Sequence, residues 1–163
     1  MEIACGSVRR GLLEPNNVLK RGRTKRALNT TVKPEIEITM LRYDDPISFL
    51  ATKNSEAARR FYVDVLGLKL VADEQFALVF DLNGTMLRMF KVQQLQPAPH
   101  TVLGWRVADI AAKVTELKDR GVTFERFEGM SQDTLGVWTS PTGAKVAWFK
   151  DPDGNGLSLT QFP

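Results

Sequence analysis

The sequence predicts an α+β fold made of two βαβββ modules, and two observations support this prediction. First, module 1 (about 46–92) and module 2 (about 101–161) repeat one order of elements at an offset of 55 residues: an apolar run, a capped helix and further apolar runs. A fixed-period repeat indicates a duplicated structural unit. Second, Gly, Pro, Asn and Asp separate the apolar runs, which is typical of strands joined by tight turns.

The helix of module 1 has a recognisable start, buried face and end. Asn54 or Ser55 supplies the side-chain oxygen of an N-cap. Apolar residues at spacings of three and four within 58–66 predict one buried helix face, and Gly67 is placed to end the helix. The pair Asn83-Gly84 predicts a β-hairpin. Strands are predicted over residues 46–53, 68–72, 76–82 and 85–92.

Module 2 repeats this order. Asp109 is its predicted N-cap, Ile110, Val114 and Leu117 form the buried stripe of the helix, and Gly121 ends it. The Pro-rich linker between the modules predicts an extended spacer. The linker covers residues 93–99, and the strands of module 2 are predicted over residues 101–108, 122–127, 135–139, 144–150 and 156–161.

Residues 1–39 differ in composition from residues 40–163. They hold eight Lys/Arg against four Asp/Glu and show no sustained hydrophobic period, so we expect a basic, disordered segment before a domain at 40–163. The run KRGRTKR leaves a nucleic-acid-binding arm or a targeting signal open as alternatives. A native start at Met40 is a further alternative.

The composition excludes several classes of protein. No apolar stretch is long enough to cross a bilayer, and the apolar region of a secretory signal is missing after the first basic residues. Cys5 is the only cysteine, which excludes an intrachain disulfide framework and a cysteine metal cage. These observations favour a cytoplasmic protein that does not interact with membranes.

Three segments carry a family resemblance. FYVDVLGL in the first helix, TVLGWRVADI at the start of module 2 and FKDPDGNGLSLTQF near the C-terminus resemble the vicinal oxygen chelate superfamily, which includes glyoxalase I, bleomycin-resistance proteins and extradiol dioxygenases. The resemblance covers about residues 42–162. It implies a glyoxalase/bleomycin-resistance-like domain in which the two modules form a curved mixed sheet around a cup. The cup forms within one chain or across a homodimer, swapped or unswapped.

Metal-dependent members of this superfamily hold a divalent ion at four positions, two on the first strands and two on the last strands of the modules. Matched by spacing from the helix caps and the turns, these positions are Ile47, Arg88, Val102 and Ser158 in this chain. Two of these side chains are apolar, one is a permanent cation, and a lone hydroxyl is a poor ligand. The resemblance therefore implies no metal at this site, and we expect no other cofactor.

His100 is the only histidine and leaves two alternatives open. It lies two residues before Val102, so it would share that face of the strand if the strand extended so far, and could then be a ligand. The other alternative is a surface residue at the start of the strand. In either case its contribution to a pocket is undecided.

Alternation along the strands predicts which other side chains face the cup. The result is an apolar cavity with one cation and two hydroxyls, a composition typical of small-molecule pockets. Trp148 lines the cup or its mouth, with core packing as the alternative, and Trp105 is expected in the core. The predicted ligand-binding residues are Ile47, Phe49, Arg88, Phe90, Val102, Trp148, Ser158 and Thr160.

Arg88 is the most informative of these residues and has two interpretations. Its guanidinium group could hold a carboxylate or phosphate, or neutralise an enolate. Alternatively, it could pair with an internal acid or reach solvent at the rim of the cup. The sequence does not decide between them.

The sequence leaves catalytic residues unassigned. Asp151 and Asp153 look like paired carboxylates, but Pro152 and Gly154 predict a turn at this place, and no nucleophile lies beside a base. The leading hypothesis is a metal-free, dimeric, bleomycin-resistance-like protein that binds a small organic ligand. One alternative is a lyase or isomerase related to glyoxalase I that acts on a small oxygenated substrate. The least favoured is a nucleic-acid binder that uses the basic segment.

Overall fold

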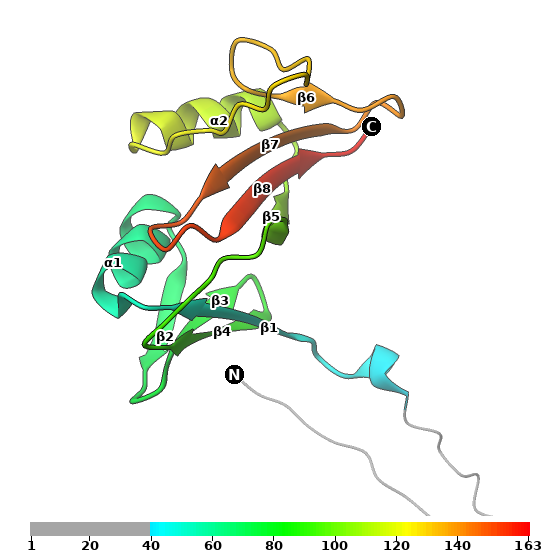
Figure 1. Cartoon of the computed structure of the whole chain (residues 1–163). Coiled ribbons are helices and arrows are strands. Elements are labelled where there is room, and N and C mark those ends of the chain that lie inside the picture. Colours follow the sequence, from blue (N-terminus) through cyan, green and yellow to red (C-terminus); the bar gives the residue numbers. More distant parts are fainter. Residues whose placement is uncertain (1–39) are drawn as a thin grey trace, which may run out of the picture. The chain divides into compact units, whose positions relative to one another are not determined.

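The structure, a computed structural model, describes residues 40–163, and the predictions made for residues 1–39 lie outside this part. The described residues form two modules, each with a four-stranded mixed sheet and a helix (Figure 1). A short 3-10 turn, η1 (Leu41–Tyr43), precedes the first strand. The predicted α+β fold is confirmed. Within one chain the two sheets are separate, each with its own order of strands.

In module 1 the strand order is β1-β4-β3-β2. The first strand runs parallel to β4, and the other neighbours are antiparallel. Asn83 and Gly84 turn the chain between β3 and β4 with φ angles of 54° and 95°, as a type I′ hairpin turn requires. The strands are β1 (Ile47–Thr52), β2 (Lys69–Asp73), β3 (Ala77–Leu82) and β4 (Thr85–Lys91).

The helix of module 1 starts and ends as predicted but changes its winding. Helix α1 (Ser55–Arg60) begins after Asn54, whose side chain accepts a hydrogen bond from the Ala57 amide at 3.0 Å. It continues as a π-helical turn, η2 (Phe61–Val65), and Gly67 ends it with a φ of 73°. The hydrophobic spacing gave no sign of the π-helical turn.

Module 2 has the strand order β5-β8-β7-β6, with a regular α-helix, α2 (Ile110–Asp119). Asp109 caps this helix by accepting a hydrogen bond from the Ala112 amide at 3.0 Å. The two modules thus share one strand order, first-fourth-third-second. The strands are β5 (Thr101–Arg106), β6 (Trp138–Thr139), β7 (Lys145–Lys150) and β8 (Gly156–Gln161).

The strand predicted at 122–127 is wrong, because only an isolated bridge between Phe124 and Phe149 forms there. The strand predicted at 135–139 shortens to β6. Two side chains bind the backbone of the loop between these segments instead. Arg126 donates to the carbonyl oxygens of Asp133 and Thr134, and Gln132 donates to the carbonyl oxygen of Gly136. Such local hydrogen bonds compete with a strand ladder.

One face of each sheet packs against its helix and forms the hydrophobic core. The opposite face, which no helix covers, is called the open face below. In the core the side chains are large and fully enclosed, and the largest include Tyr62, Leu78, Phe80, Leu87, Met89, Val114, Phe149 and Leu157.

A buried cluster of acids joins the modules. Asp151–Gly154 is a turn, as expected, with a hydrogen bond from the Gly154 amide to the Asp151 carbonyl. Asp153 accepts from the Thr52 hydroxyl at 2.5 Å and from the Lys53 amide at 3.2 Å. Asp151 accepts from the Tyr62 hydroxyl at 3.0 Å. The turn before β8 is therefore fastened to β1 and to the helix of module 1.

The Tyr62 hydroxyl should make the stability of the protein depend on alkaline pH. Burial, and then the negative charge of Asp151, raise the pKa of Tyr62 above its ordinary value of 10. The folded state therefore holds this proton more tightly than the unfolded state. Its contribution is fully present below pH 10 and is lost as the pH rises above it, by about 1.4 kcal/mol per pH unit.

We expect Tyr62→Phe to remove this loss, because phenylalanine has no proton to give up. The check is urea unfolding of both proteins at several values between pH 9 and pH 11. Tyr43, which is 70% exposed, provides the control Tyr43→Phe. Equal alkaline slopes for wild type and Tyr62→Phe would contradict the prediction.

Candidate functional site

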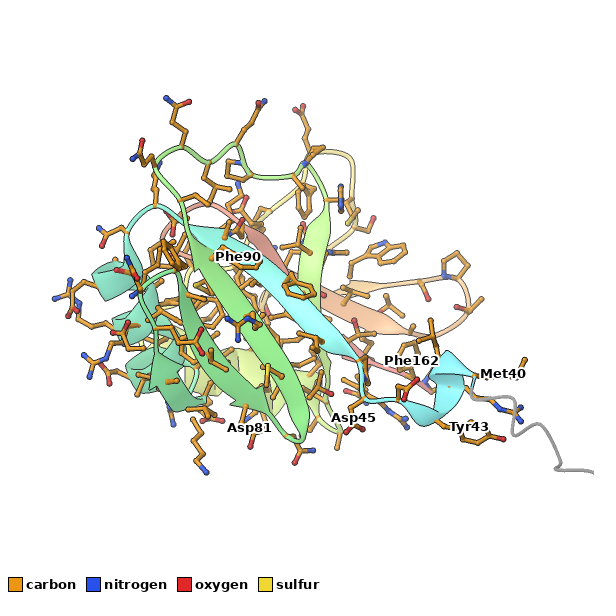
Figure 2. The ribbon with its side chains drawn as sticks, turned by 90° about the horizontal axis from the view of Figure 1, so that it is seen from below. Met40, Tyr43, Asp45, Asp81, Phe90 and Phe162 are labelled. Atoms are coloured by element: carbon orange, nitrogen blue, oxygen red, sulfur yellow. The ribbon has the colours of Figure 1, made fainter. Side chains whose placement is uncertain are left out.

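The open face of the first sheet carries an exposed aromatic pair. Phe49 on β1 and Phe90 on β4 lie with their rings parallel and their centroids 5.8 Å apart, and they are 57% and 41% exposed. Ile47 and Ala51 lie on the same side of β1, and the register pairs Phe49 with Arg88. Phe90 can be followed in Figure 2, which shows the first sheet from below. The sheet thus presents a flat apolar surface beside a cation.

Arg88 forms an ion pair at this surface. Its Nη2 atom lies 2.6 Å from Oε2 of Glu74, and the two side chains are 29% and 45% exposed. Exposed ion pairs of this kind contribute little free energy, so an anionic group of a ligand can replace Glu74 at low cost. The structure therefore supplies the acid partner that one interpretation of Arg88 required and leaves the guanidinium group within reach of a ligand.

The open face of the second sheet is more polar. Ser158 lies beside Gly104 and Trp148, and Thr160 lies beside Arg106. The Ser158 side chain is 7% exposed. The approach of β5 and β8 is close here, since a Cβ atom on Gly104 would lie 2.7 Å from the Ser158 hydroxyl oxygen. This face combines hydroxyl groups with an indole ring.

Val102 lies at an irregularity of β5. The register shifts between Thr101 and Leu103, so that Thr101 pairs with Gly156 and Leu103 with Leu157. Val102 packs against the hydrophobic core. Because the bulge inserts one residue, Thr101 takes the place on the open face that matches Ile47 of module 1. We therefore leave Val102 out of the site proposed below.

The four positions that hold a metal in related folds can now be compared by geometry. Phe49 and Gly104 each lie five residues before the cap of their module's helix. The register pairs Phe49 with Arg88 and Gly104 with Ser158, so Arg88 and Ser158 occupy equivalent positions. The set is then Ile47, Arg88, Thr101 and Ser158. A permanent cation, two neutral hydroxyls and an alkyl group do not fit a divalent ion. Nor do three or more His, Cys, Asp or Glu side chains gather anywhere within residues 40–163.

The open face of the first sheet is not covered by the second sheet of the same chain. Figure 2 looks directly onto it, and Ile47 and Met86 on this face are 48% and 41% exposed. A single chain therefore presents two unlike open faces, and its predicted site residues divide between them. Ile47, Phe49, Arg88 and Phe90 belong to the first face, and Trp148, Ser158 and Thr160 belong to the second.

A cavity of about 550 Å³ lies at one end of the second open face, beside the linker that joins the modules. We call it the linker pocket. Its lining comes from the end of the linker, the segment before the long loop of module 2, and the facing ends of β7 and β8. The side chains used below are those of Pro97, Pro99, His100, Glu125, Phe127, Trp148 and Lys150.

Of the side chains that line this pocket, the sequence predicts a ligand-binding role for Trp148 and leaves the role of His100 open. Glu125, Phe127 and Lys150 are predicted to lie in strands, with no role in binding. The alternation of Trp148 and Lys150 on β7 was a usable signal, because both side chains had to share one face. The position of the linker was not predictable, since it depends on contacts with the turn after β7.

Comparisons with known proteins agree with this architecture. A family model described as the Glyoxalase/Bleomycin resistance protein/Dioxygenase superfamily matches residues 45–159. No protein with curated annotation matches the chain in sequence. Within the described residues, no helix is long and apolar enough to span a membrane.

Several solved structures share the fold. A lactoylglutathione lyase from Agrobacterium tumefaciens superimposes with a TM-score of 0.56 at 20% identity and covers 71% of this chain and 90% of its own. An antibiotic binding protein from a Streptomyces species has a TM-score of 0.57 at 24% identity, and the match covers 77% of this chain and 100% of that protein. A member of the same superfamily from Sphaerobacter thermophilus has a TM-score of 0.57 at 23% identity, and the match covers 72% of this chain and 95% of that protein. At these identities the likeness establishes the fold alone. With the family model matching most of its length, the chain belongs to the Glyoxalase/Bleomycin resistance protein/Dioxygenase superfamily.

Proposed function

We propose that this protein binds a small aromatic ligand without a metal ion, on the open faces of its two sheets. The observation that carries the proposal is the exposed Phe49–Phe90 pair beside Arg88. Two parallel rings on an uncovered sheet face form a surface on which a flat ligand can stack. The adjacent guanidinium group can bind an anionic or oxygen-rich substituent.

The two open faces of one chain do not meet, which favours a dimer as the complete binding unit. In a two-fold dimer, the first sheet of one copy would face the second sheet of the other, and the same contact would occur twice. Each cup would then combine the phenylalanine pair of one chain with Ser158, Thr160 and Trp148 of its partner copy. The assembly we propose is therefore a swapped homodimer. We also propose a cytoplasmic location, because Cys5 is the only cysteine and disulfides are rare in that compartment.

The similar structures include proteins of both hypothesised classes, an antibiotic binding protein and a lyase. The donor set of this chain favours the first class. A glyoxalase-type reaction relies on a metal that polarises substrate oxygens, and Ile47, Arg88, Thr101 and Ser158 do not fit one. The third hypothesis, nucleic-acid binding by the basic segment, concerns residues outside the described part.

The double variant Phe49→Ala/Phe90→Ala should lower the affinity for a fluorescent anthracycline, a flat aromatic probe, by at least about tenfold. Each ring removed takes a stacking surface worth roughly 1 kcal/mol or more. Fluorescence titration measures the affinity, and sedimentation velocity measures the dimer. The control is Phe76→Ala, because Phe76 is 68% exposed and lies outside the pair.

Two results would contradict the proposed function. One is equal anthracycline affinity in wild type and the double variant. The other is a stoichiometric divalent ion in the purified protein together with lyase or isomerase turnover that a chelator abolishes. A monomer that binds the probe as tightly as a dimer would contradict the shared cup alone.

A further inference from the structure

The linker pocket is a preformed cavity. A Cβ atom on Gly154 would lie 3.3 Å from Cγ of Pro97, and one on Gly156 would lie 3.0 Å from the carbonyl oxygen of His100. The linker therefore lies directly against the turn and the start of β8. Proline also fixes its own backbone φ angle. A wall built in this way loses little conformational freedom when a ligand binds.

The turn beneath the linker is itself held from module 1. Asp153 binds Thr52 and the Lys53 amide, and the Asn155 side chain donates to the Ala51 carbonyl at 3.0 Å. Asp153 and Asn155 are almost completely buried, at 7% and 4% exposure. The pocket thus keeps its shape through contacts that both modules supply within a single chain.

The apolar lining of the pocket suits a flat ring. The rings of Phe127 and Trp148 are nearly perpendicular, at 85°, with centroids 5.4 Å apart. Pro97 and Pro99 add further rigid apolar surface. A ligand ring placed here can contact the face of one aromatic side chain and the edge of another, which are the favoured geometries.

The polar groups of the pocket favour a negative charge. Lys150 Nζ lies 3.0 Å from Oε2 of Glu125, with side chains 55% and 32% exposed, so this ion pair is weak enough for a ligand carboxylate to displace Glu125. The side chain of His100 makes no hydrogen bond to any other described residue and lines the same pocket. Lys150 and His100 can therefore donate to an acid group, while Trp148 and Phe127 contact the ring.

We propose that the linker pocket is a second ligand site, complete within one chain, that binds a flat aromatic carboxylate. Its volume of about 550 Å³ lies within the usual range for small-molecule sites. Its lining includes Trp148 of the proposed cup and Thr101, which matches Ile47, but no residue of the first sheet, and the pocket needs no second copy. Its occupancy should therefore be independent of the phenylalanine pair on the first sheet.

Isothermal titration calorimetry with two matched probes tests this site. 2-Naphthoate should bind about tenfold more tightly than the neutral 2-naphthamide, because a charge-assisted hydrogen bond to an ammonium group is stronger than a neutral one. Lys150→Gln should remove this difference and lower the naphthoate affinity about tenfold. The matched control is Lys145→Gln, on the same strand but outside the pocket, which should bind naphthoate as wild type does.

Three outcomes would overturn the proposal: no naphthoate binding at millimolar concentration, equal affinities for the two probes, or equal losses in Lys150→Gln and Lys145→Gln. The double variant Phe49→Ala/Phe90→Ala separates the two sites. If it abolishes naphthoate binding, the ligand lies on the first sheet and the linker pocket is not the site. If it abolishes anthracycline binding alone, both proposals stand. Thermal unfolding of each variant shows that it is folded.

Discussion

Asp151→Ala is expected to lower the free energy of unfolding by about 3–5 kcal/mol, because it removes the acceptor of a buried network. The Asp151 carboxylate is 5% exposed and accepts hydrogen bonds from the Tyr62 hydroxyl, the Asn155 side chain and the amides of Asp153 and Asn155. Without it, the Tyr62 hydroxyl and the amides of Asp153 and Asn155 lose this acceptor in the interior, while the Asn155 side chain keeps only the Ala51 carbonyl. Urea unfolding followed by far-UV circular dichroism measures the loss.

Asp81→Ala is the matched control for this prediction. Asp81 also accepts a hydrogen bond from a turn amide, that of Gly84 at 2.7 Å, but this bond is exposed. We expect it to cost about 1 kcal/mol or less. If Asp151→Ala cost no more than Asp81→Ala, the acid cluster would not be a determinant of stability.

Phe149→Ala should lower the free energy of unfolding by a similar amount, about 3–5 kcal/mol, because it leaves a cavity in the core of module 2. Phe149 is 1% exposed, and its ring lies 5.4 Å from that of Phe124 and 6.4 Å from that of Trp105. Its backbone also forms the isolated bridge to Phe124. The substitution therefore removes the ring that packs on Phe124 beside this bridge, in addition to leaving a cavity in the core.

Hydrogen exchange distinguishes this effect from a general loss of stability. Amides in segment 122–127 should lose protection at a lower denaturant concentration in Phe149→Ala than the amides of β1 and β4. Phe127→Ala is the control, since Phe127 is 43% exposed and should cost little. Uniform loss of protection across both modules would contradict a local role for Phe149.

The duplication and its caps were predictable because they depend on local chemistry. Asn54 and Asp109 cap the helices, and Asn83-Gly84 makes the hairpin, through contacts that span only a few residues. Alternation predicts the faces of the first and last strands of module 1, and the structure places Phe49, Arg88 and Phe90 on one surface.

The errors arise where one residue is inserted or where distant segments meet. The bulge at Thr101–Leu103 moves Val102 out of the alternation, and no sequence signal marks it. The segment 122–127 has the composition of a strand, but the Arg126 and Gln132 side chains donate hydrogen bonds to the backbone of the following loop, and only an isolated bridge forms. The Glu74–Arg88 pair and the linker pocket depend on tertiary contacts that no local pattern contains.

The acid cluster that joins the modules also has a consequence for the order in which the chain folds during synthesis. Thr52 and Tyr62 leave the ribosome first, and their partners Asp153 and Asp151 follow 101 and 89 residues later. At about 5–20 residues per second, roughly 5–20 s pass before these two carboxylate acceptors are synthesised. The contacts that join the two modules can therefore form only after the turn before the last strand has emerged.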